Sequence, residues 1–268
     1  MRACFLAILL TTISTARADD TLPLPAKKTV ARHHLLYHDV ALAGGTTVYI
    51  LSETVLKSRL APEVCRWCST PSIDIDVRNS LKWHDTQLAD QMSAITAYVI
   101  APLVPSAIVI GTSWHDVGFT DAVDDGLAIG EAGIATALIG QAIKLSVGRQ
   151  RPFVAFGEPG RVYDPDDDVS FFSGHTSFAF AVAAASGTIA SEHHYRTAPI
   201  VWGVGMTAAA ATGYFRIAAD KHYFTDVTIG AVVGTGMGLL FPRLFHGHGR
   251  IHVIPAPTEN GLALVGSF

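Results

Sequence analysis

The sequence contains few charged residues and no excess of basic ones. Lys, Arg, Asp and Glu make up 16% of its 268 residues, and the formal net charge is −4. A chain of this charge will not bind nucleic acid through bulk electrostatics. Internal repeats and low-complexity runs are absent from the sequence. Hydrophobic residues make up 49% and the mean hydropathy is +0.34, which is high for a soluble enzyme and low for a dense membrane protein.

Cysteine is scarce as well. Cys4 lies within residues 1–18, which have the positive start, apolar run and small-residue cleavage site of a secretory signal. Removal of this segment would leave 17 basic and 23 acidic residues, a net charge of −6. Cys65 and Cys68 remain, and in an exported protein such a pair most simply forms a local disulfide. A redox pair would need a flanking strand and helix, and a zinc site would need two more ligands.

Strand-like alternation is absent from the long apolar segments, which are rich in Ala and Gly. We therefore expect helices that pack closely through small residues, arranged as an all-α bundle of about five to six core helices. Only the first segment, with 20 residues, is long enough to cross a membrane comfortably. The segments are 92–111, 127–143, 176–190, 198–215 and 227–241, and a shorter apolar stretch at 41–55 is expected to pack over the core.

The chain is expected to divide into four parts. After the signal at 1–18, residues 19–90 form an N-terminal segment packed on the core, and 91–245 form the helical core. The tail at 246–268 alternates around Glu259-Asn260-Gly261 and predicts a small β-hairpin that packs on the helices. Within the N-terminal segment, 71–90 is expected to be an exposed connection or a surface helix.

Three smaller polar features each allow two interpretations. His33, His34 and His38 are interpreted as a polar face, because only one carboxylate lies close by in the sequence and no cysteine does. The acidic run 164–168 is expected to be a solvated loop, with a cation site as the alternative. Glu131 is expected either inside the bundle near a pocket, or at the surface or in a buried pair.

Three polar clusters stand at the ends of apolar segments, and their residue types suit a phosphate group. Two arginines and a lysine can surround a tetrahedral oxyanion, because guanidinium groups donate two hydrogen bonds at once and an ammonium adds a point charge. A serine offers a hydroxyl, and a glycine lets backbone N–H groups approach the anion, particularly where a helix begins. These residues are Lys144, Arg151, Ser173, Gly174 and Arg216.

Two histidines complete this group. His222 lies four residues before Asp226, so on one helix face the carboxylate can hold the imidazole in a fixed tautomer. An oriented histidine is a competent nucleophile. His175 is then free to protonate the leaving alcohol and later to activate water. Nothing in this group requires a metal, although each cluster taken alone also fits an ordinary capping or salt-bridge role.

The combined pattern resembles the signature of the type 2 phosphatidic acid phosphatase superfamily, which also includes bacterial non-specific acid phosphatases and vanadium-dependent haloperoxidases. It consists of Lys-x6-Arg-Pro at 144–152, Ser-Gly-His at 173–175 and Arg-x5-His-x3-Asp at 216–226. The resemblance implies that His222 forms a phosphohistidine, that Asp226 orients it and that His175 serves as acid and base. It also implies a phosphate cradle made by Lys144, Arg151, Ser173, Gly174 and Arg216.

Two positions depart from the family pattern. Phe172 stands where a proline normally precedes Ser-Gly-His, and Phe215 stands where a serine normally precedes the arginine of the third motif. The first change should alter only how the turn is stiffened. The second removes a hydroxyl donor, which bears on rate and substrate preference more than on the class of reaction.

We therefore expect a phosphoric ester hydrolase that needs no metal or other cofactor, although vanadate could occupy the phosphate site. The substrate would be a phosphate monoester or a diphosphate, and a lipid such as phosphatidate, undecaprenyl diphosphate or a lipid A phosphate if the site lies at a membrane. The alternatives are a soluble periplasmic acid phosphatase, a vanadate-dependent haloperoxidase and a non-enzymatic scaffold. The oligomeric state is left open.

The motifs also predict a location. If the five apolar segments span a membrane, all three motifs fall on one face. With the signal cleaved and 92–111 crossing first, that face is the periplasmic side of a bacterial inner membrane. A further crossing at 41–55 would place it in the cytoplasm, unless the signal remains as an anchor. The connection 112–126 carries four aspartates and no Lys or Arg, so the positive-inside rule adds little.

Overall fold

The computed structural model describes residues 27–157, 160, 162–245, 252–258 and 261–267, and it describes side chains between residues 39 and 244 of these ranges. The predicted signal at 1–18 lies outside the described residues. The side chains of His33, His34 and His38 do so as well, and their interpretation as a polar face stays a prediction.

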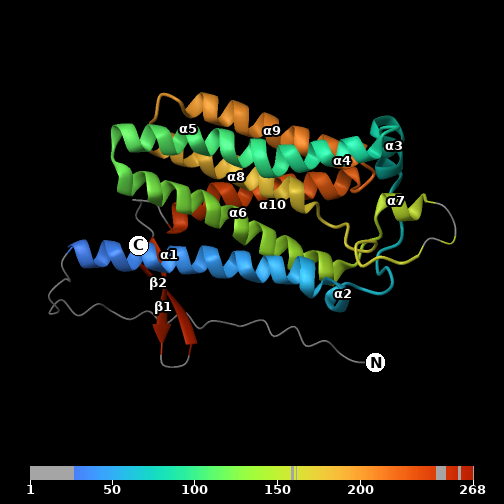
Figure 1. Cartoon of the computed structure of the whole chain (residues 1–268), viewed down its shortest axis with the longest axis horizontal. Helices are drawn as coiled ribbons and strands as arrows, with labels where there is room; N and C mark the ends of the chain where they lie inside the picture. The colour runs from blue at the N-terminus through green and yellow to red at the C-terminus, as the bar shows by residue number, and fades with distance from the viewer. Residues whose placement is uncertain (1–26, 158–159, 161, 246–251, 259–260, 268) are drawn as a thin grey trace.

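A bundle of long helices forms the body of the protein (Figure 1). The central helix α8 (Gly174–Glu192) packs against the others on several sides. Of its 19 residues, 13 are buried, and most of these are Ala, Ser, Thr or Gly, so neighbouring backbones can approach closely. The surrounding helices are α5 (Ala101–Asp116), α6 (Phe119–Val147), α9 (Ala198–Ala218) and α10 (Phe224–Phe245). The expected all-α class is confirmed.

The larger apolar side chains lie where these helices meet. Val109 of α5, Ile129 of α6, Val182 and Ile189 of α8 and Val201 of α9 belong to one buried cluster. This cluster fixes the helices relative to one another, so their ends are held in register at the end of the bundle where the polar motifs lie.

Three helices of the described residues are long and apolar enough to cross a membrane, judged by length and composition. They comprise 31, 29 and 21 residues: Thr86–Asp116, Phe119–Val147 and Phe224–Leu244. The expectation that only the first segment is long enough is therefore wrong. The apolar runs stop at polar residues such as Asp124 and Lys144, whereas helix α6 contains both.

The first of these spans is continuous through three elements, α4 (Thr86–Ile95), the π-helical turn η2 (Thr96–Ile100) and α5. The connection that follows it is much shorter than expected. Only Val117 and Gly118 separate α5 from α6, and the backbone of Gly118, at φ 151°, makes the sharp turn. Three of the aspartates expected in a loop at 112–126 thus belong to the first turns of α6.

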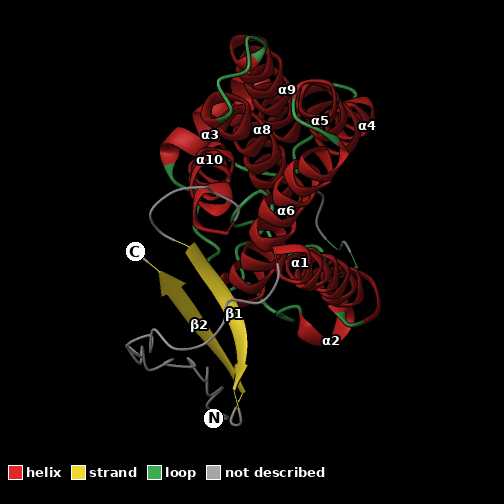
Figure 2. Ribbon diagram, turned by 90° about the vertical axis from the view of Figure 1, so that its left-hand side faces the viewer, coloured by secondary structure: helices red, strands yellow, loops and turns green. Residues whose placement is uncertain are grey.

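An N-terminal helix lies beside the bundle. Helix α1 (Lys27–Ile50) continues through the π-helical turn η1 (Leu51–Val55) and packs along α6, which lies between it and α8 (Figure 2). It is longer than the short helix expected at 41–55. Its end leads into α2 (Lys57–Leu60) at the end of the bundle that carries the motifs.

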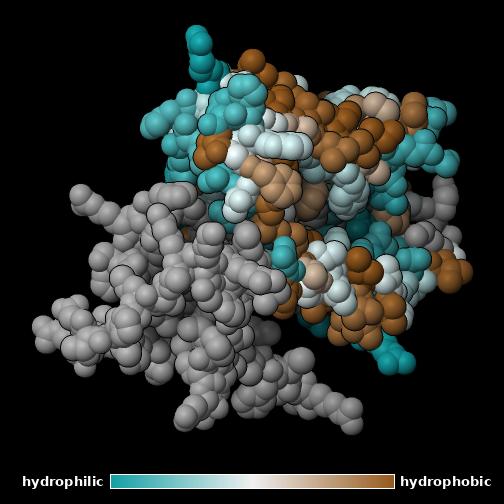
Figure 3. Space-filling view, turned by 60° about the vertical axis from the view of Figure 1, so that its left-hand side comes forward, coloured by the Kyte–Doolittle hydropathy of each residue, from teal (hydrophilic) through white to brown (hydrophobic). Residues whose placement is uncertain are grey.

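Much of the described surface is apolar (Figure 3). Large hydrophobic side chains are more than half exposed on each of the long outer helices, among them Val48 on α1, Leu103 on α5, Ile200 on α9 and Val232 on α10. Exposed apolar side chains thus occur on all sides of the bundle and are not confined to one docking face. This surface suits contact with lipid, in agreement with the three candidate spans.

Of the two alternatives predicted for residues 71–90, an exposed connection or a surface helix, the structure shows the helix. These residues include α3 (Ser72–Leu81) and the start of α4, and α3 buries Asp74 and Arg78. Arg78 donates two hydrogen bonds, of 2.5 and 2.7 Å, to the carboxylate of Asp220. The short helix α7 (Pro152–Ala155) lies at the same end of the bundle.

The C-terminal segment contains two strands, β1 (His252–Thr258) and β2 (Gly261–Ser267), which pair in antiparallel register. Their side chains lie outside the described residues. Two residues of the predicted turn, Glu259 and Asn260, also lie outside the described residues. The predicted hairpin and its packing on the helices therefore stay predictions.

Candidate active site

Four helix ends meet at one end of the bundle. Helix α6 ends and α9 ends there, and α8 and α10 begin there (Figure 1). A cavity of about 420 Å³ opens between them. The three polar motifs, far apart in the sequence, thus lie on one face, as expected from the order of the apolar segments. Of the predicted site residues, the cavity is lined by Lys144, Arg151, Gly174, His175, Arg216 and His222.

The cavity carries an excess of positive charge. Its walls contain five cationic side chains and three carboxylates, with the two histidines in addition. Lys144, Arg151 and Arg216 are all more than nine-tenths buried, and cations held close together in a poorly solvated site favour binding of an anion. The charged lining residues are Glu53, Lys57, Asp90, Lys144, Arg151, Asp166, Arg216 and Lys221.

Arg151 is fixed by the acidic loop. Its Nε donates to the carbonyl oxygen of Asp166 at 2.7 Å, and its terminal nitrogens bond the Asp166 carboxylate at 3.1 Å and the carbonyl oxygen of Lys221 at 3.1 Å. Lys57 donates to the same carboxylate at 2.6 Å. Burial opposes ionisation of Asp166, but Arg151 and Lys57 outweigh it and hold the pKa of this carboxyl well below its usual range.

The acidic run 164–168 is thus solvated only at its start, where Asp164 is exposed. Asp167 and Asp168 are buried, at 4% and 5% exposure, and Asp166 lies in the cavity wall. Nothing in the sequence near this run shows that it would pack against the arginine of the first motif, because the contact depends on how the loop between α7 and α8 folds back.

Arg216 is oriented by α4. One of its terminal nitrogens donates to Asp90 at 2.5 Å and to the Ser93 hydroxyl at 3.1 Å. Its Nε is buried and has no hydrogen-bond partner among the described residues. One buried donor of this guanidinium therefore remains available to a ligand.

His222 lies at the floor of the cavity with its two ring nitrogens in different surroundings. Nε2 lies 3.3 Å from a terminal nitrogen of Arg151, and Nδ1 lies 3.7 Å from a carboxylate oxygen of Asp226. Burial lowers the pKa of His222 well below its usual range, and Arg151, Arg216 and Lys144 lower it further. The imidazole is therefore neutral near pH 7, as a nucleophile requires.

Asp226 lies behind His222 and does not line the cavity. Its carboxylate accepts hydrogen bonds from Arg149 at 2.5 Å, from the Ser170 hydroxyl at 2.6 Å and from the backbone N–H of Tyr223 at 3.0 Å. With both oxygens engaged, the carboxylate is fixed on the Nδ1 side of the histidine.

The start of α8 supplies the remaining motif. Ser173 is fully buried, caps the helix and bonds the Thr176 hydroxyl at 2.8 Å, so its hydroxyl is not among the groups that line the cavity. A Cβ atom at Gly174 would meet Lys144 Nζ at 2.9 Å, which shows how closely the helix start approaches that ammonium. The His175 ring packs against Tyr98 at 4.7 Å.

Sequence reasoning missed several groups of this site. Tyr49, Glu53 and Lys57 follow one another at four-residue spacing and line the cavity from α1, η1 and α2. This spacing places them on one helix face, which is the signal that could have indicated a shared surface. Asp90 and Asp166 gave no local signal at all.

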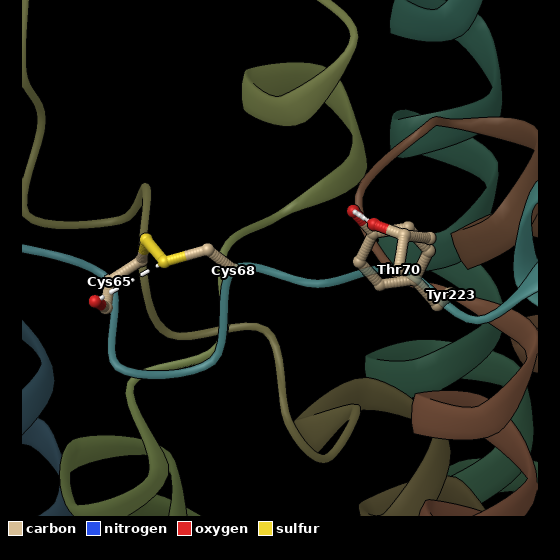
Figure 4. Close-up of a disulfide and its surroundings, with 4 residues drawn as sticks. All are labelled: Cys65, Cys68, Thr70 and Tyr223. Carbon is tan, nitrogen blue, oxygen red and sulfur yellow. Dashed lines mark hydrogen bonds between the residues drawn. A yellow bond between two sulfur atoms is a disulfide. The ribbon is translucent and has the colours of Figure 1, made fainter.

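A disulfide lies near the site. Cys65 and Cys68 are joined by the predicted disulfide. Figure 4 shows this bond and, further along the same segment, Thr70, whose hydroxyl lies 3.2 Å from that of Tyr223. The described residues contain no group of three or more His, Cys, Asp or Glu side chains that could hold a metal ion. Metal independence stays a prediction.

Comparison with known proteins identifies the family. The family model of the PAP2 superfamily matches residues 125–250. Undecaprenyl-diphosphatase BcrC of Bacillus subtilis (strain 168) is 32% identical over 165 residues, which are 62% of this chain and 79% of that protein. The chain belongs to the PAP2 superfamily. It is accordingly a phosphoric ester hydrolase.

Two solved structures are similar to this PAP2 protein, each at 18% sequence identity. One is a transmembrane PAP2-type phosphatidylglycerolphosphate phosphatase from Bacillus subtilis, with a TM-score of 0.46, covering 79% of this chain and 93% of that one. The other is LpxE from Aquifex aeolicus, with a TM-score of 0.45, covering 63% and 92% respectively. The three apolar spans indicate that this PAP2 protein is a membrane protein.

Proposed function

We propose that the protein hydrolyses lipid phosphates, as monoesters or diphosphates, through a phosphohistidine formed at His222 and without a metal. One observation carries this proposal. A neutral histidine faces a cavity with an excess of cations through Nε2, while a fixed carboxylate lies on its Nδ1 side. This is the arrangement that in-line attack on a bound phosphoryl group requires.

The cationic side chains that line the cavity bind the phosphate. Lys144, Arg151 and Arg216 surround the phosphoryl oxygens, and the unpaired Nε of Arg216 becomes satisfied. The start of α8 at Gly174 directs backbone N–H groups and the positive end of the helix dipole at the anion. As charge develops on the transferring group, these donors stabilise it without rearrangement.

The reaction proceeds in two steps. Nε2 of His222 attacks phosphorus, and His175 gives a proton to the leaving oxygen. Burial and the neighbouring cations lower the pKa of His175 in the free protein, so its imidazole takes up this proton when the phosphate anion binds. Asp226 stabilises the positive charge that the His222 imidazole gains when the P–N bond forms. In the second step His175 takes a proton from water, the resulting hydroxide attacks phosphorus, and the P–N bond breaks to release phosphate and neutral His222.

A lipid substrate is supported by the surroundings of the cavity. A second cavity of about 240 Å³ between α1, α6, η2 and α8 has mainly apolar walls, and it shares Tyr49, Tyr98, Lys144 and Gly174 with the first. A phosphate in the polar cavity could therefore place a hydrocarbon chain in the apolar one. The similarity to an undecaprenyl-diphosphatase agrees with this substrate class.

We place the protein in the inner membrane of a bacterium, exported with its active site on the periplasmic side. The disulfide Cys65–Cys68 supports this side, because it lies at the same end of the bundle as the cavity and such bonds persist in oxidising compartments. Labelling of Cys65→Ser protein in intact cells with a membrane-impermeant maleimide tests it. Modification of Cys68 supports a periplasmic site, and modification only after permeabilisation contradicts it.

The function is tested with purified protein in detergent and a chelator present. Phosphate release from short-chain phosphatidate, farnesyl diphosphate and p-nitrophenyl phosphate is compared for wild type, His222→Ala, His175→Ala and, as a matched control, His84→Ala, because His84 is exposed. We expect the first two variants to lose activity and the control to retain it. Full activity of His222→Ala would contradict the proposed nucleophile, and vanadate-dependent halide oxidation without phosphate release would point to a haloperoxidase.

A further inference from the structure

Arg149 is a buried cation that does not line the cavity. It is 1% exposed, and it is held between the rings of Trp67 and Tyr223, whose centroids lie 4.1 and 4.3 Å from its guanidinium carbon. One terminal nitrogen donates to Asp226 at 2.5 Å and the other to Asp74 at 2.7 Å. The guanidinium therefore bridges α3 and the carboxylate behind the proposed nucleophile.

The loop closed by the disulfide carries Trp67, one of the two rings that enclose Arg149. Trp67 stands between Cys65 and Cys68. The backbone N–H of Trp67 donates to the carbonyl oxygen of Gly148 at 3.2 Å, and the backbone carbonyl of Trp67 accepts from the N–H of Gln150 at 3.2 Å. These bonds on either side of Arg149 place the indole against the guanidinium.

The same segment also contacts Tyr223, the second ring beside Arg149. Thr70 lies 3.2 Å from the Tyr223 hydroxyl (Figure 4), and Tyr223 also donates its backbone N–H to Asp226. The segment 65–70 thus contacts both rings that enclose Arg149.

We propose that Arg149 is a positioning residue for the reaction, and that the disulfide-closed loop Cys65–Cys68 holds it in place through Trp67. Arg149 fixes the Asp226 carboxylate on the Nδ1 side of His222, so that Nε2 keeps its lone pair directed at phosphorus. The inference rests on the proposed function, because it concerns the same nucleophile.

Asp74 has a second part in this arrangement. Its carboxylate accepts from Arg149 and also from the backbone N–H and hydroxyl of Thr225, at 2.9 and 2.8 Å. It balances the charge of Arg149, which leaves the group of Asp74, Arg149 and Asp226 with one net negative charge. Arg151, Arg216, Lys144 and His175 also act on His222, and all four oppose a positive imidazole. The single negative charge behind His222 is therefore what stabilises the phosphorylated imidazole.

The test compares kcat and KM for four variants in matched pairs. Trp67→Leu is paired with Trp114→Leu, because Trp114 is an exposed tryptophan on α5. Asp74→Asn is paired with Asp76→Asn, because Asp76 lies on the same helix and is exposed. We expect Trp67→Leu and Asp74→Asn to lower kcat roughly 10- to 100-fold with little change in KM, as for a nucleophile displaced by a fraction of an ångström. The two control variants retain the wild-type values.

Two further variants separate positioning from simple loss of stability. Trp67→Phe keeps an aromatic ring over the guanidinium and should recover most of kcat, whereas Arg149→Lys cannot bridge two carboxylates and should not. The double variant Cys65→Ala/Cys68→Ala should lower kcat less than Trp67→Leu does. Wild type treated with a thiol reductant should behave like this double variant.

The outcomes distinguish the two proposals. Wild-type kcat in both Trp67→Leu and Asp74→Asn, or a change confined to KM, would overturn the positioning role while leaving the phosphatase intact. Equal losses in Trp67→Phe and Trp67→Leu that follow their thermal stability would overturn it as well. A wild-type protein as inactive as His222→Ala would overturn both proposals together.

Discussion

Asp90 of α4 accepts a hydrogen bond of 2.5 Å from Arg216 of α9, across 126 positions of the sequence. The carboxylate thus lies on the guanidinium proposed to bind phosphate, at the wall of the same cavity. Asp166 bonds Arg151 in a similar way. The cationic cradle therefore carries its own counter-charges, which orient the arginines and also reduce the attraction of the cavity for a free anion.

The pair of Asp90 and Arg216 leads to a prediction about product inhibition. Asp90→Asn leaves an oxygen that can accept from Arg216 but removes a negative charge from the cavity. We expect orthophosphate and vanadate to inhibit this variant about 5- to 10-fold more strongly, a gain of about 1 kcal/mol. Inhibition constants measured at constant ionic strength check it. Asp85→Asn is the control, because Asp85 caps α4 by accepting from Leu88 and asparagine caps equally well. Unchanged or weaker inhibition of Asp90→Asn would contradict the counter-charge role.

The surroundings of His222 lead to a prediction about pH. Its pKa is lowered by burial and by neighbouring cations, so the neutral nucleophile persists in the free enzyme when the pH falls below about 6.5, the ordinary value for histidine. We expect the acidic limb of kcat/KM, corrected for titration of the substrate, to lie below that pH. A limb at or above it would show that His222 titrates normally.

The stability of the fold should also depend on the protonation of His222, and acid should lower it. The unfolded chain binds a proton at His222 below about pH 6.5 and the folded chain does not, so acid favours unfolding. The free energy of unfolding should therefore decrease as the pH falls through this range, and less steeply in His222→Ala. Parallel pH dependences of the two proteins in chemical unfolding would contradict this assignment.

Gly174 leads to a prediction about the cradle. A Cβ atom at this position would come within 2.9 Å of Lys144 Nζ, so Gly174→Ala should displace the ammonium and raise KM about 10-fold, equivalent to about 1.4 kcal/mol. Stability should change little, because the displaced atom ends a flexible side chain. Gly203→Ala is the control, since its Cβ would enter open space. Unaltered KM and phosphate inhibition in Gly174→Ala would exclude a close approach of the helix start to the substrate.

The buried pair of Arg78 and Asp220 leads to a prediction about stability. Both side chains are largely buried, and Arg78 also lies 4.3 Å above the ring of Phe156. Arg78→Ala leaves Asp220 without its main partner, so we expect the free energy of unfolding to fall by about 3–5 kcal/mol. Lys82→Ala is the matched control. Lys82 reaches the same carboxylate at 3.2 Å but is 39% exposed, and its loss should cost less than about 1 kcal/mol. Equal effects of the two variants in urea unfolding would contradict this ranking.

The helices and the meeting of the motifs could be predicted because their signals are local. Apolar segments rich in Ala and Gly indicate helices, and Lys144, His175 and Arg216 stand at the ends of such segments. Once the order of the segments is known, these ends must share a face. Helix ends were less predictable, since α6 continues through Asp124 and Asp125 into polar sequence.

The counter-charges and the support of Asp226 could not be predicted, because they depend on contacts between distant parts of the chain. Asp74 lies in a stretch of mixed composition and contacts Arg149, 75 positions later. Nothing in the spacing around either residue distinguishes that buried ion pair from two solvated charges. The same holds for Lys57 and Asp166, which are 109 positions apart.

Residues before position 125 and residues after it have different roles in the proposed active site. The segment that matches the superfamily, 125–250, carries the proposed nucleophile, acid and phosphate cradle. Residues that precede it supply the counter-charge on Arg216, which is Asp90, and one of the two carboxylates that bind Arg149, which is Asp74. Tyr49, Glu53 and Lys57, which also precede it, form part of the cavity wall. Exchange of this preceding region between relatives should therefore change which phosphate is accepted and how tightly the product is held, while the bond that is broken stays the same.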